Sequence, residues 1–185
     1  MELILASNSP RRKELLVDCG FDFKVIVSDY EEKAFSSDPV ETSVQFAIGK
    51  AKAVFNQLAN KNACVIGADT VVFNEGVILN KPKNDLEATE MLKFLSGKTH
   101  KVITGYCVIN KFAMQYGYDE TFVTFNNLSE YTIKEYVKSG LYKGKSGSYG
   151  IQDPFPLVKE YKGSINNVIG LPTEKLFPII KQMMK

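Results

Sequence analysis

Histidine is almost absent from this chain of 185 residues, in which His100 is the only example. A metal site built from several histidines is therefore excluded, and acid–base chemistry falls to carboxylates, lysines or tyrosines. Cysteine is also scarce, because Cys19, Cys64 and Cys107 are odd in number, widely spaced and set among apolar neighbours. This pattern predicts reduced thiols in a core and argues against disulfides or a zinc site.

Long apolar runs and a strong net charge are missing as well. No apolar run approaches the roughly 18 residues that a membrane span needs, and the first residues lack the pattern of a signal peptide. We therefore expect a cytoplasmic protein without a membrane partner. The net charge of only +2 argues against a nucleic-acid partner, so affinity for phosphate must come from local clustering. The Walker pattern Gly-x-x-x-x-Gly-Lys followed by Ser or Thr is absent, which argues against a P-loop NTPase.

The patterning of the chain predicts an α/β protein. Its length and its 44% of hydrophobic residues suffice for a sizeable core, and without a linker we treat residues 1–185 as one domain. Periodicity predicts amphipathic helices and some long antiparallel strands. The expected strands cover residues 3–6, 21–27 and 63–73, a pair within 101–126, and a strand and turn over 163–172; the expected helices begin near residues 10, 42, 84, 129 and 173.

The N-terminal segment combines a buried strand with a helix start. The apolar run ends at Ala6, Ser9 suits an N-cap and Pro10 suits the first helical position, so backbone amides point outward from the positive helix end. Arg11 and Arg12 add planar guanidinium groups that match phosphate oxygens, which predicts a polyphosphate cradle. The alternative is an ordinary capped helix with two solvated arginines, and the spacing alone does not separate the two.

Carboxylates occur at two informative places. Asp69 lies inside the continuous apolar run 63–73, and a buried aspartate needs a paired cation, a metal or a catalytic role. A structural aspartate satisfied by its neighbours is the alternative. Glu31 and Glu32 belong to the acidic loop 28–32, which either holds a divalent cation or is simply solvated.

Two lysines flank the apolar stripe of the helix predicted over residues 42–58. Lys50 and Lys52 each lie about 100° from Ala51 around the helix axis, so either side chain can reach into a neighbouring cleft. The periodicity does not choose between them.

Several segments resemble the motifs of the Maf family of nucleotide pyrophosphatases, first named as septum formation inhibitors. The resemblance runs in order from residue 3 to about 176. The matching segments are Ser7-Asn8-Ser9-Pro10-Arg11-Arg12-Lys13-Glu14-Leu15-Leu16, Gly49-Lys50-Ala51-Lys52-Ala53, Gly67-Ala68-Asp69-Thr70-Val71-Val72 with Lys81-Pro82, Leu95-Ser96-Gly97-Lys98-Thr99-His100-Lys101-Val102-Ile103-Thr104-Gly105, and Asn167-Val168-Ile169-Gly170-Leu171-Pro172.

The resemblance implies a fold, an activity and a set of site residues. The implied fold is a mixed, twisted central sheet flanked by helices, with two lobes, a nucleotide cleft between them, and a homodimer as an allowed assembly. The implied activity is hydrolysis of a nucleoside triphosphate to the monophosphate and pyrophosphate with Mg²⁺ or Mn²⁺. Asp69 is the implied general base and, with Glu32, a metal ligand. The implied substrate-binding residues are Ser7, Arg11, Arg12, Lys50, Thr70, Lys81 and Gln152. His100 is left outside the site, as a structural hydrogen-bonding group.

The glycine-rich segment 143–152 provides evidence about which substrate the protein binds. Considered alone it is either a flexible surface loop or a ligand-binding loop, in which the Gln152 amide can pair with one edge of a pyrimidine. It resembles the Maf segment Asp-Lys-Ala-Gly-Ala-Tyr-Gly-Ile-Gln of members acting on dTTP and UTP. It departs from that segment at Gly144, Ser146 and Ser148, and loss of the acid predicts a looser metal or lysine contact.

Arg11 and Thr70 are also tied by the resemblance to substrate preference. The alternatives are a 7-methyl-GTP pyrophosphatase of the same family, a nucleotide-binding regulator of cell division without turnover, and a sequence-independent nucleic-acid binder.

Overall fold

The computed structural model describes residues 1–33 and 36–185. Within these residues the chain forms a seven-stranded mixed sheet in the order β2-β1-β3-β5-β6-β7, with β4 paired to β3. β1 runs parallel to β2 and β3, and the other neighbours are antiparallel. The strands are β1 (Glu2–Leu5), β2 (Lys24–Val25), β3 (Ala63–Asn74), β4 (Val77–Leu79), β5 (Thr99–Ile109), β6 (Met114–Phe125) and β7 (Val158–Lys162).

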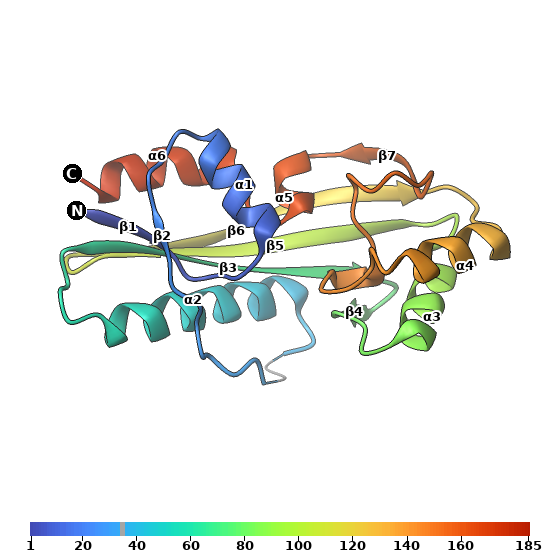
Figure 1. The fold of residues 1–185 in the computed structure, drawn as a ribbon, viewed down its shortest axis with the longest axis horizontal. Helices are drawn as coiled ribbons and strands as arrows, with labels where there is room; N and C mark the ends of the chain where they lie inside the picture. Colours follow the sequence, from blue (N-terminus) through green and yellow to red (C-terminus); the bar gives the residue numbers. More distant parts are fainter. Residues whose placement is uncertain (34–35) are drawn as a thin grey trace.

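Helices cover both faces of the sheet. Figure 1 shows α2 on one face of the long strands, α1 and α6 on the other, and α3 and α4 at the end far from both termini. The helices are α1 (Pro10–Asp18), α2 (Pro39–Gln57), α3 (Asp85–Leu95), α4 (Glu130–Ser139), α5 (Ile165–Ile169) and α6 (Thr173–Met183), with a 3₁₀ turn η1 (Ser146–Ser148). No helix among the described residues is both long enough and apolar enough to cross a membrane.

Alternation along β3 divides the core into layers, because successive side chains of a strand point to opposite faces. Val65 packs in the cluster that contains Ala47 and Ala51 of α2, whereas Ile66 packs in the cluster that contains Leu16 of α1. A third cluster joins the far ends of β3, β5 and β6 to α3 and α4. The expected mixed sheet with two lobes is therefore confirmed.

Two sequence expectations about strands are wrong. The strand expected over 21–27 shortens to Lys24–Val25, and residues 163–172 contain the helix α5 where a strand was expected. Ser164 caps that helix by accepting a hydrogen bond from the Asn167 backbone N–H, at 3.1 Å. The buried Asn167 side chain then donates to the Val102 carbonyl, at 3.0 Å. Side-chain hydrogen bonds to β5 therefore keep α5 helical. The spacing of apolar residues in the sequence does not reveal such bonds.

Candidate active site

A cleft of about 460 Å³ opens between α1, the loop after β2, the middle of β3 and the glycine-rich loop. Its size is that of a small-molecule site. All of the site residues expected from the sequence line it: Ser7, Arg11, Arg12, Glu32, Lys50, Asp69, Thr70, Lys81 and Gln152. A second hollow of about 590 Å³ shares Glu32, Asp69, Thr70 and Lys81 with the first. The two carboxylates and Lys81 therefore stand where two cavities meet.

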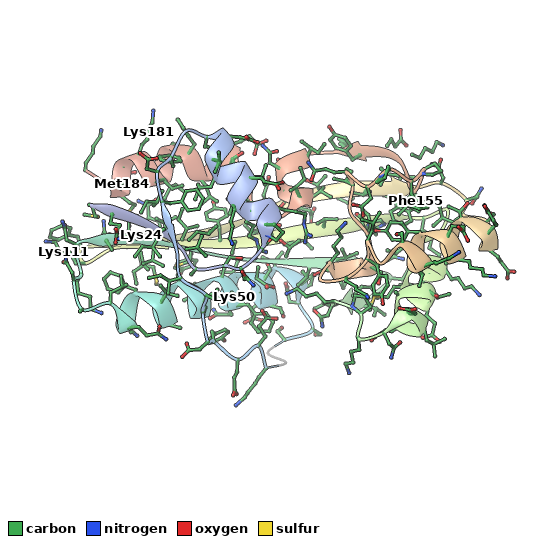
Figure 2. The ribbon with its side chains drawn as sticks, in the orientation of Figure 1. Lys24, Lys50, Lys111, Phe155, Lys181 and Met184 are labelled. Carbon is green, nitrogen blue, oxygen red and sulfur yellow. The ribbon has the colours of Figure 1, made fainter. Side chains whose placement is uncertain are left out.

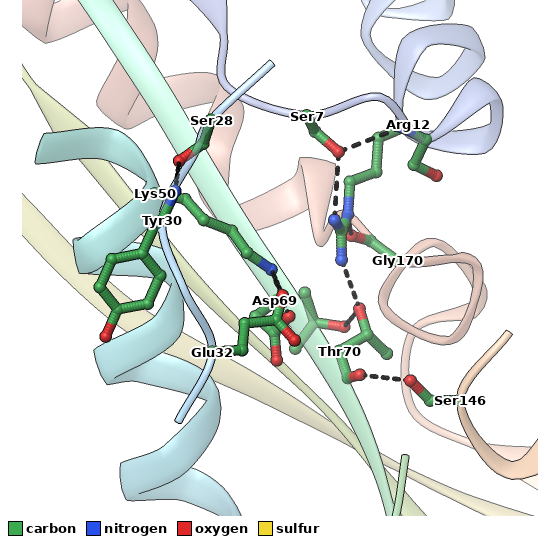
Figure 3. Close-up of polar contacts among 12 residues, drawn as sticks. Ser7, Arg12, Ser28, Tyr30, Glu32, Lys50, Asp69, Thr70, Ser146 and Gly170 are labelled. Atoms are coloured by element: carbon green, nitrogen blue, oxygen red, sulfur yellow. Dashed lines mark hydrogen bonds and ion pairs between the residues drawn. The ribbon is translucent and has the colours of Figure 1, made fainter. Parts of the chain in front are cut away.

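An ion triad lies at the bottom of the cleft. The Lys50 ammonium donates to Asp69 Oδ1 at 2.6 Å and lies 2.5 Å from Glu32 Oε1. Figure 2 shows Lys50 on α2 near the centre of the molecule, and Figure 3 shows it reaching the two carboxylates. Asp69 is only 6% exposed, so its burial is balanced by a paired cation. Two carboxylates share one ammonium, which leaves the triad with a net negative charge.

Neighbouring cations stabilise the ionised form of the Glu32 carboxyl. Burial raises the pKa of this carboxyl, but the hydrogen bond and charge of Lys50, with the charges of Lys81 and Arg12, lower it by more. The pKa of Glu32 therefore lies below its usual range, and the group is ionised at neutral pH.

Arg12 ties three elements together. Its guanidinium donates to the Gly170 carbonyl at 2.7 Å, to Ser7 Oγ at 3.2 Å and to Thr70 Oγ1 at 3.0 Å (Figure 3). These bonds join α1 to β3 and to the end of α5. The interpretation of two solvated arginines is therefore wrong for Arg12. Arg11 is less constrained, since its guanidinium donates to the Gly144 carbonyl at 3.4 Å.

The helix start that faces the cleft has open amides. Ser9 occupies the N-cap position of α1 and Pro10 the first turn, but the Ser9 side chain makes no capping hydrogen bond. Ser7 Oγ instead accepts from the Ser9 backbone N–H at 3.2 Å. The first-turn amides and the positive end of the helix are thus available to an anion.

The glycine-rich loop is packed against the core, so the flexible surface loop is not what forms. A Cβ on Gly147 would lie 2.8 Å from the Val72 side chain. Ser146 Oγ donates to the Thr70 carbonyl at 2.7 Å, and Ser148 Oγ donates to Met91 Sδ at 3.0 Å. Both serine departures from the family segment therefore make contacts that alanine cannot make.

Tyr149 anchors the same loop. It is 5% exposed, and its hydroxyl is 2.8 Å from His100 Nε2. His100 is thus a buried hydrogen-bonding group beneath the loop, as expected from the sequence.

Gly144 supplies no carboxylate, but another acid of the same loop pairs with the neighbouring lysine. Lys145 Nζ lies 2.5 Å from both carboxylate oxygens of Asp153. Sequence reasoning missed this pair because the carboxylate comes from the opposite end of the loop. The available signal was an acid immediately after Gln152.

The donor set of the cleft fits a hard divalent cation. Among the described residues, no group of three or more His, Cys, Asp or Glu side chains is placed so that it could hold a metal ion. Glu32 and Asp69 nevertheless converge on one ammonium position, and both donors are carboxylate oxygens. Mg²⁺ and Mn²⁺ prefer oxygen ligands, and Mg²⁺ is commonly held by one or two carboxylates together with substrate phosphates. Two carboxylates therefore suffice for a metal that arrives with a nucleotide.

Comparison with known proteins places this arrangement in a family. A family model described as Maf-like protein matches residues 2–183. The chain belongs to the Maf family. A dTTP/UTP pyrophosphatase of Pyrococcus abyssi (strain GE5 / Orsay) is 43% identical to this Maf protein over 180 residues, covering 97% of this chain and 95% of the relative. A dTTP/UTP pyrophosphatase of Bacillus cereus (strain AH820) is 46% identical over 184 residues, covering 98% and 95%.

A solved structure shares the fold of this Maf protein. A nucleoside-triphosphatase, also titled dITP/XTP pyrophosphatase, from Mycobacterium abscessus superposes with a TM-score of 0.50 at 11% identity, covering 100% of this chain and 99% of that one. At this identity the likeness concerns the fold alone.

Proposed function

We propose that this Maf protein is a dTTP/UTP pyrophosphatase, which hydrolyses the α–β phosphoanhydride bond to give the nucleoside monophosphate and pyrophosphate. The observation that carries the proposal is that one cleft is lined by the arginines, the lysines, both carboxylates and Gln152. The relatives at 43% and 46% identity, which bear that activity in their names, support the choice of substrate.

The triphosphate is bound by cations and amides. Arg11 and Lys81 line the cleft with the uncapped first turn of α1, so they supply positive charge against the β- and γ-phosphate oxygens. Arg12 acts mainly through Ser7 and Thr70, which it holds at the cleft wall by hydrogen bonds of 3.2 and 3.0 Å. Lys50 also holds the two carboxylates in place, because its charge is balanced by them.

The chemical step is attack of water on the α-phosphorus. The water oxygen bonds to that phosphorus, the bond to the α–β bridging oxygen breaks, and pyrophosphate leaves with the bonding electrons. Asp69 accepts the proton of the water, and the Lys50 ammonium at 2.6 Å fixes the orientation of the carboxylate.

Glu32 and Asp69 are the residues that would hold Mg²⁺ or Mn²⁺. The cation would supply charge against the phosphate oxygens and lower the pKa of the attacking water. Since a carboxylate is a weak base toward water, the reaction depends on this help.

The base is selected by Gln152, which is exposed at the cleft wall. Its amide presents a donor beside an acceptor, and uracil and thymine present the complementary carbonyl and N–H along one edge. Methylated guanine also carries a carbonyl beside an N–H, but it is a larger base with an additional exocyclic amine donor.

The decisive experiment measures pyrophosphate release with Mg²⁺ or Mn²⁺ across dTTP, UTP, CTP, ATP, GTP and 7-methyl-GTP. We expect dTTP and UTP to be hydrolysed fastest. Preference for 7-methyl-GTP would assign the chain to the other branch of the family. Nucleotide binding without pyrophosphate release would overturn the enzymatic proposal and favour a regulator.

A further inference from the structure

Among the described carboxylates that line the cleft, Asp153 makes the most hydrogen bonds, and the proposed reaction does not use it. Its two oxygens lie 2.5 Å from Lys145 Nζ. Oδ2 also accepts from the Tyr136 hydroxyl at 2.6 Å and from the Gly150 backbone N–H at 3.0 Å. The Asp153 side chain is 11% exposed and that of Lys145 10%, so the group is nearly enclosed.

These bonds close a turn with Gln152 near its tip. The Asp153 backbone N–H donates to the Gly150 carbonyl at 3.1 Å, while the Asp153 side chain accepts from the Gly150 N–H. Gly150 and Asp153 are thus tied twice, and Ile151 and Gln152 occupy the two positions between them. A Cβ on Gly150 would lie 2.6 Å from Lys145 Nζ and 2.7 Å from Asp153 Oδ2. The close approach therefore requires glycine.

The same contacts remove Lys145 from the set of phosphate ligands. Its charge is matched by a carboxylate in a nearly dry setting, and breaking such a pair leaves an uncompensated buried charge. Tyr136 belongs to α4 and is fully buried. The turn is therefore fastened to the lobe of α3 and α4 at a rigid point.

We propose that Asp153 is a positioning residue for base recognition: it holds the 150–153 turn so that the Gln152 amide faces the nucleotide base. The inference rests on the proposed function, because it concerns the choice of base in the same cleft. Asp153 touches neither the phosphates nor the attacking water. Its loss weakens pyrimidine binding and leaves the chemical step at Asp69 intact.

The test compares Asp153→Asn, Tyr136→Phe and the control Asp119→Asn, with kcat and KM for UTP and ATP. Asp119 also pairs with a lysine, Lys175 at 2.7 Å, but it is not among the residues that line the cleft. In Asp153→Asn we expect KM for UTP to rise about tenfold, kcat to stay within twofold, and the UTP/ATP ratio of kcat/KM to fall about tenfold. Tyr136→Phe shifts the ratio less in the same direction, and Asp119→Asn does not shift it.

A double variant separates positioning from general damage. With Gln152→Ala in place, Asp153→Asn should leave the UTP/ATP ratio unchanged, because the group that it positions is gone. Equal losses for UTP and ATP, a fall in kcat alone, or an undiminished effect in the Gln152→Ala background would overturn the inference. If Asp153→Asn does not fold, Tyr136→Phe decides. A wild-type protein that releases no pyrophosphate overturns the proposed function, whereas an active wild type with unaltered selectivity in the variants overturns this inference alone.

Discussion

Lys50 joins α2, β3 and the loop after β2 through a single ammonium group. A compact point charge suits this place, because it contacts Asp69 at 2.6 Å and Glu32 at 2.5 Å from one atom. The planar fork of arginine would have to push the two carboxylates apart. In this arrangement the lysine balances part of the negative charge of the two carboxylates in the absence of a divalent cation.

Replacing the proposed base tests this arrangement directly. Asp69→Asn keeps the size of the side chain but removes the charge and the proton acceptor, so we expect pyrophosphate release from dTTP to fall by at least about 100-fold. The rate is measured with Mg²⁺ at saturating dTTP, with Asp119→Asn as the control carboxylate outside the cleft. Turnover within tenfold of the wild type would show that Asp69 is not the base.

The three cysteines differ in their expected reactivity. Cys64 and Cys107 have no exposed surface, and burial raises their pKa to about 11 and about 12. Since the thiolate is the reactive form, both are expected to stay unmodified in the native protein at pH 8. A thiol-reactive chromophore should label at most Cys19 before unfolding and three thiols afterwards. Rapid labelling of all three without denaturant would contradict the burial of the core thiols.

Contact between α2 and the sheet depends on two glycines. A Cβ on Gly67 of β3 would lie 2.2 Å from the Ala47 carbonyl oxygen, and a Cβ on Gly105 of β5 would lie 2.3 Å from the Ser43 carbonyl carbon. Both neighbours are backbone atoms of α2, which cannot step aside as a flexible side chain can. Because α2 packs so closely on the sheet, Lys50 can reach Asp69.

Gly67→Ala should therefore damage both stability and activity. The helix must move away from β3, and we expect the free energy of unfolding in urea to fall by about 3 kcal/mol. Because Lys50 and Asp69 lie on the two separated elements, kcat should fall as well. If the free energy of unfolding of this variant lay within about 0.5 kcal/mol of the wild-type value, the substitution would behave like one on the surface. That result would contradict the close packing of α2 on β3.

Predictability of the elements depended on how much of each one is buried on the sheet. The strand over 63–73 was predicted because it is central and its apolar run is continuous. The edge strand β7 was not predicted, since four of its five residues are exposed and no alternation marks it. The helix α5 was mistaken for a strand because Asn167, which holds it by long-range bonds, looks like any loop asparagine in the sequence.

Which residues line the candidate cleft was predictable from the sequence, and the hydrogen bonds among them were less so. Motif resemblance chose Lys50 over Lys52, and the structure places Lys50 in the cleft while Lys52 is exposed. The bonds of Arg12 to Gly170 and Thr70, 158 and 58 residues away, follow from tertiary packing alone. Local spacing carries no information about such pairs.

The molecule as a whole is two packed regions that share three long strands. β3, β5 and β6 run from the clusters under α1, α2 and α6 to the cluster under α3 and α4 (Figure 1). The cleft lies along these strands, so the proposed catalytic groups come mainly from one end and the proposed base-recognition turn from the other. We therefore expect substrate binding to bridge both regions, so that their relative position matters for activity.

His100 makes the stability of the whole fold depend on pH. Burial lowers the pKa of this histidine from an ordinary 6.5 to about 4, and its Nδ1 has no hydrogen-bond partner among the described residues. Between these two values the unfolded chain binds more protons than the folded one. The stabilisation is therefore complete above about pH 6.5 and is lost progressively as the pH falls toward 4.

Urea unfolding at pH 7 and at pH 4.5 measures this contribution. Over that interval we expect the wild type to lose about 2–3 kcal/mol more stability than His100→Gln, because glutamine has no group that titrates there. Comparing the two proteins cancels the carboxylates, including Glu32, which titrate in both. Equal losses would mean that His100 is protonated as readily in the folded protein as in the unfolded chain, and that the core beneath the glycine-rich loop admits water.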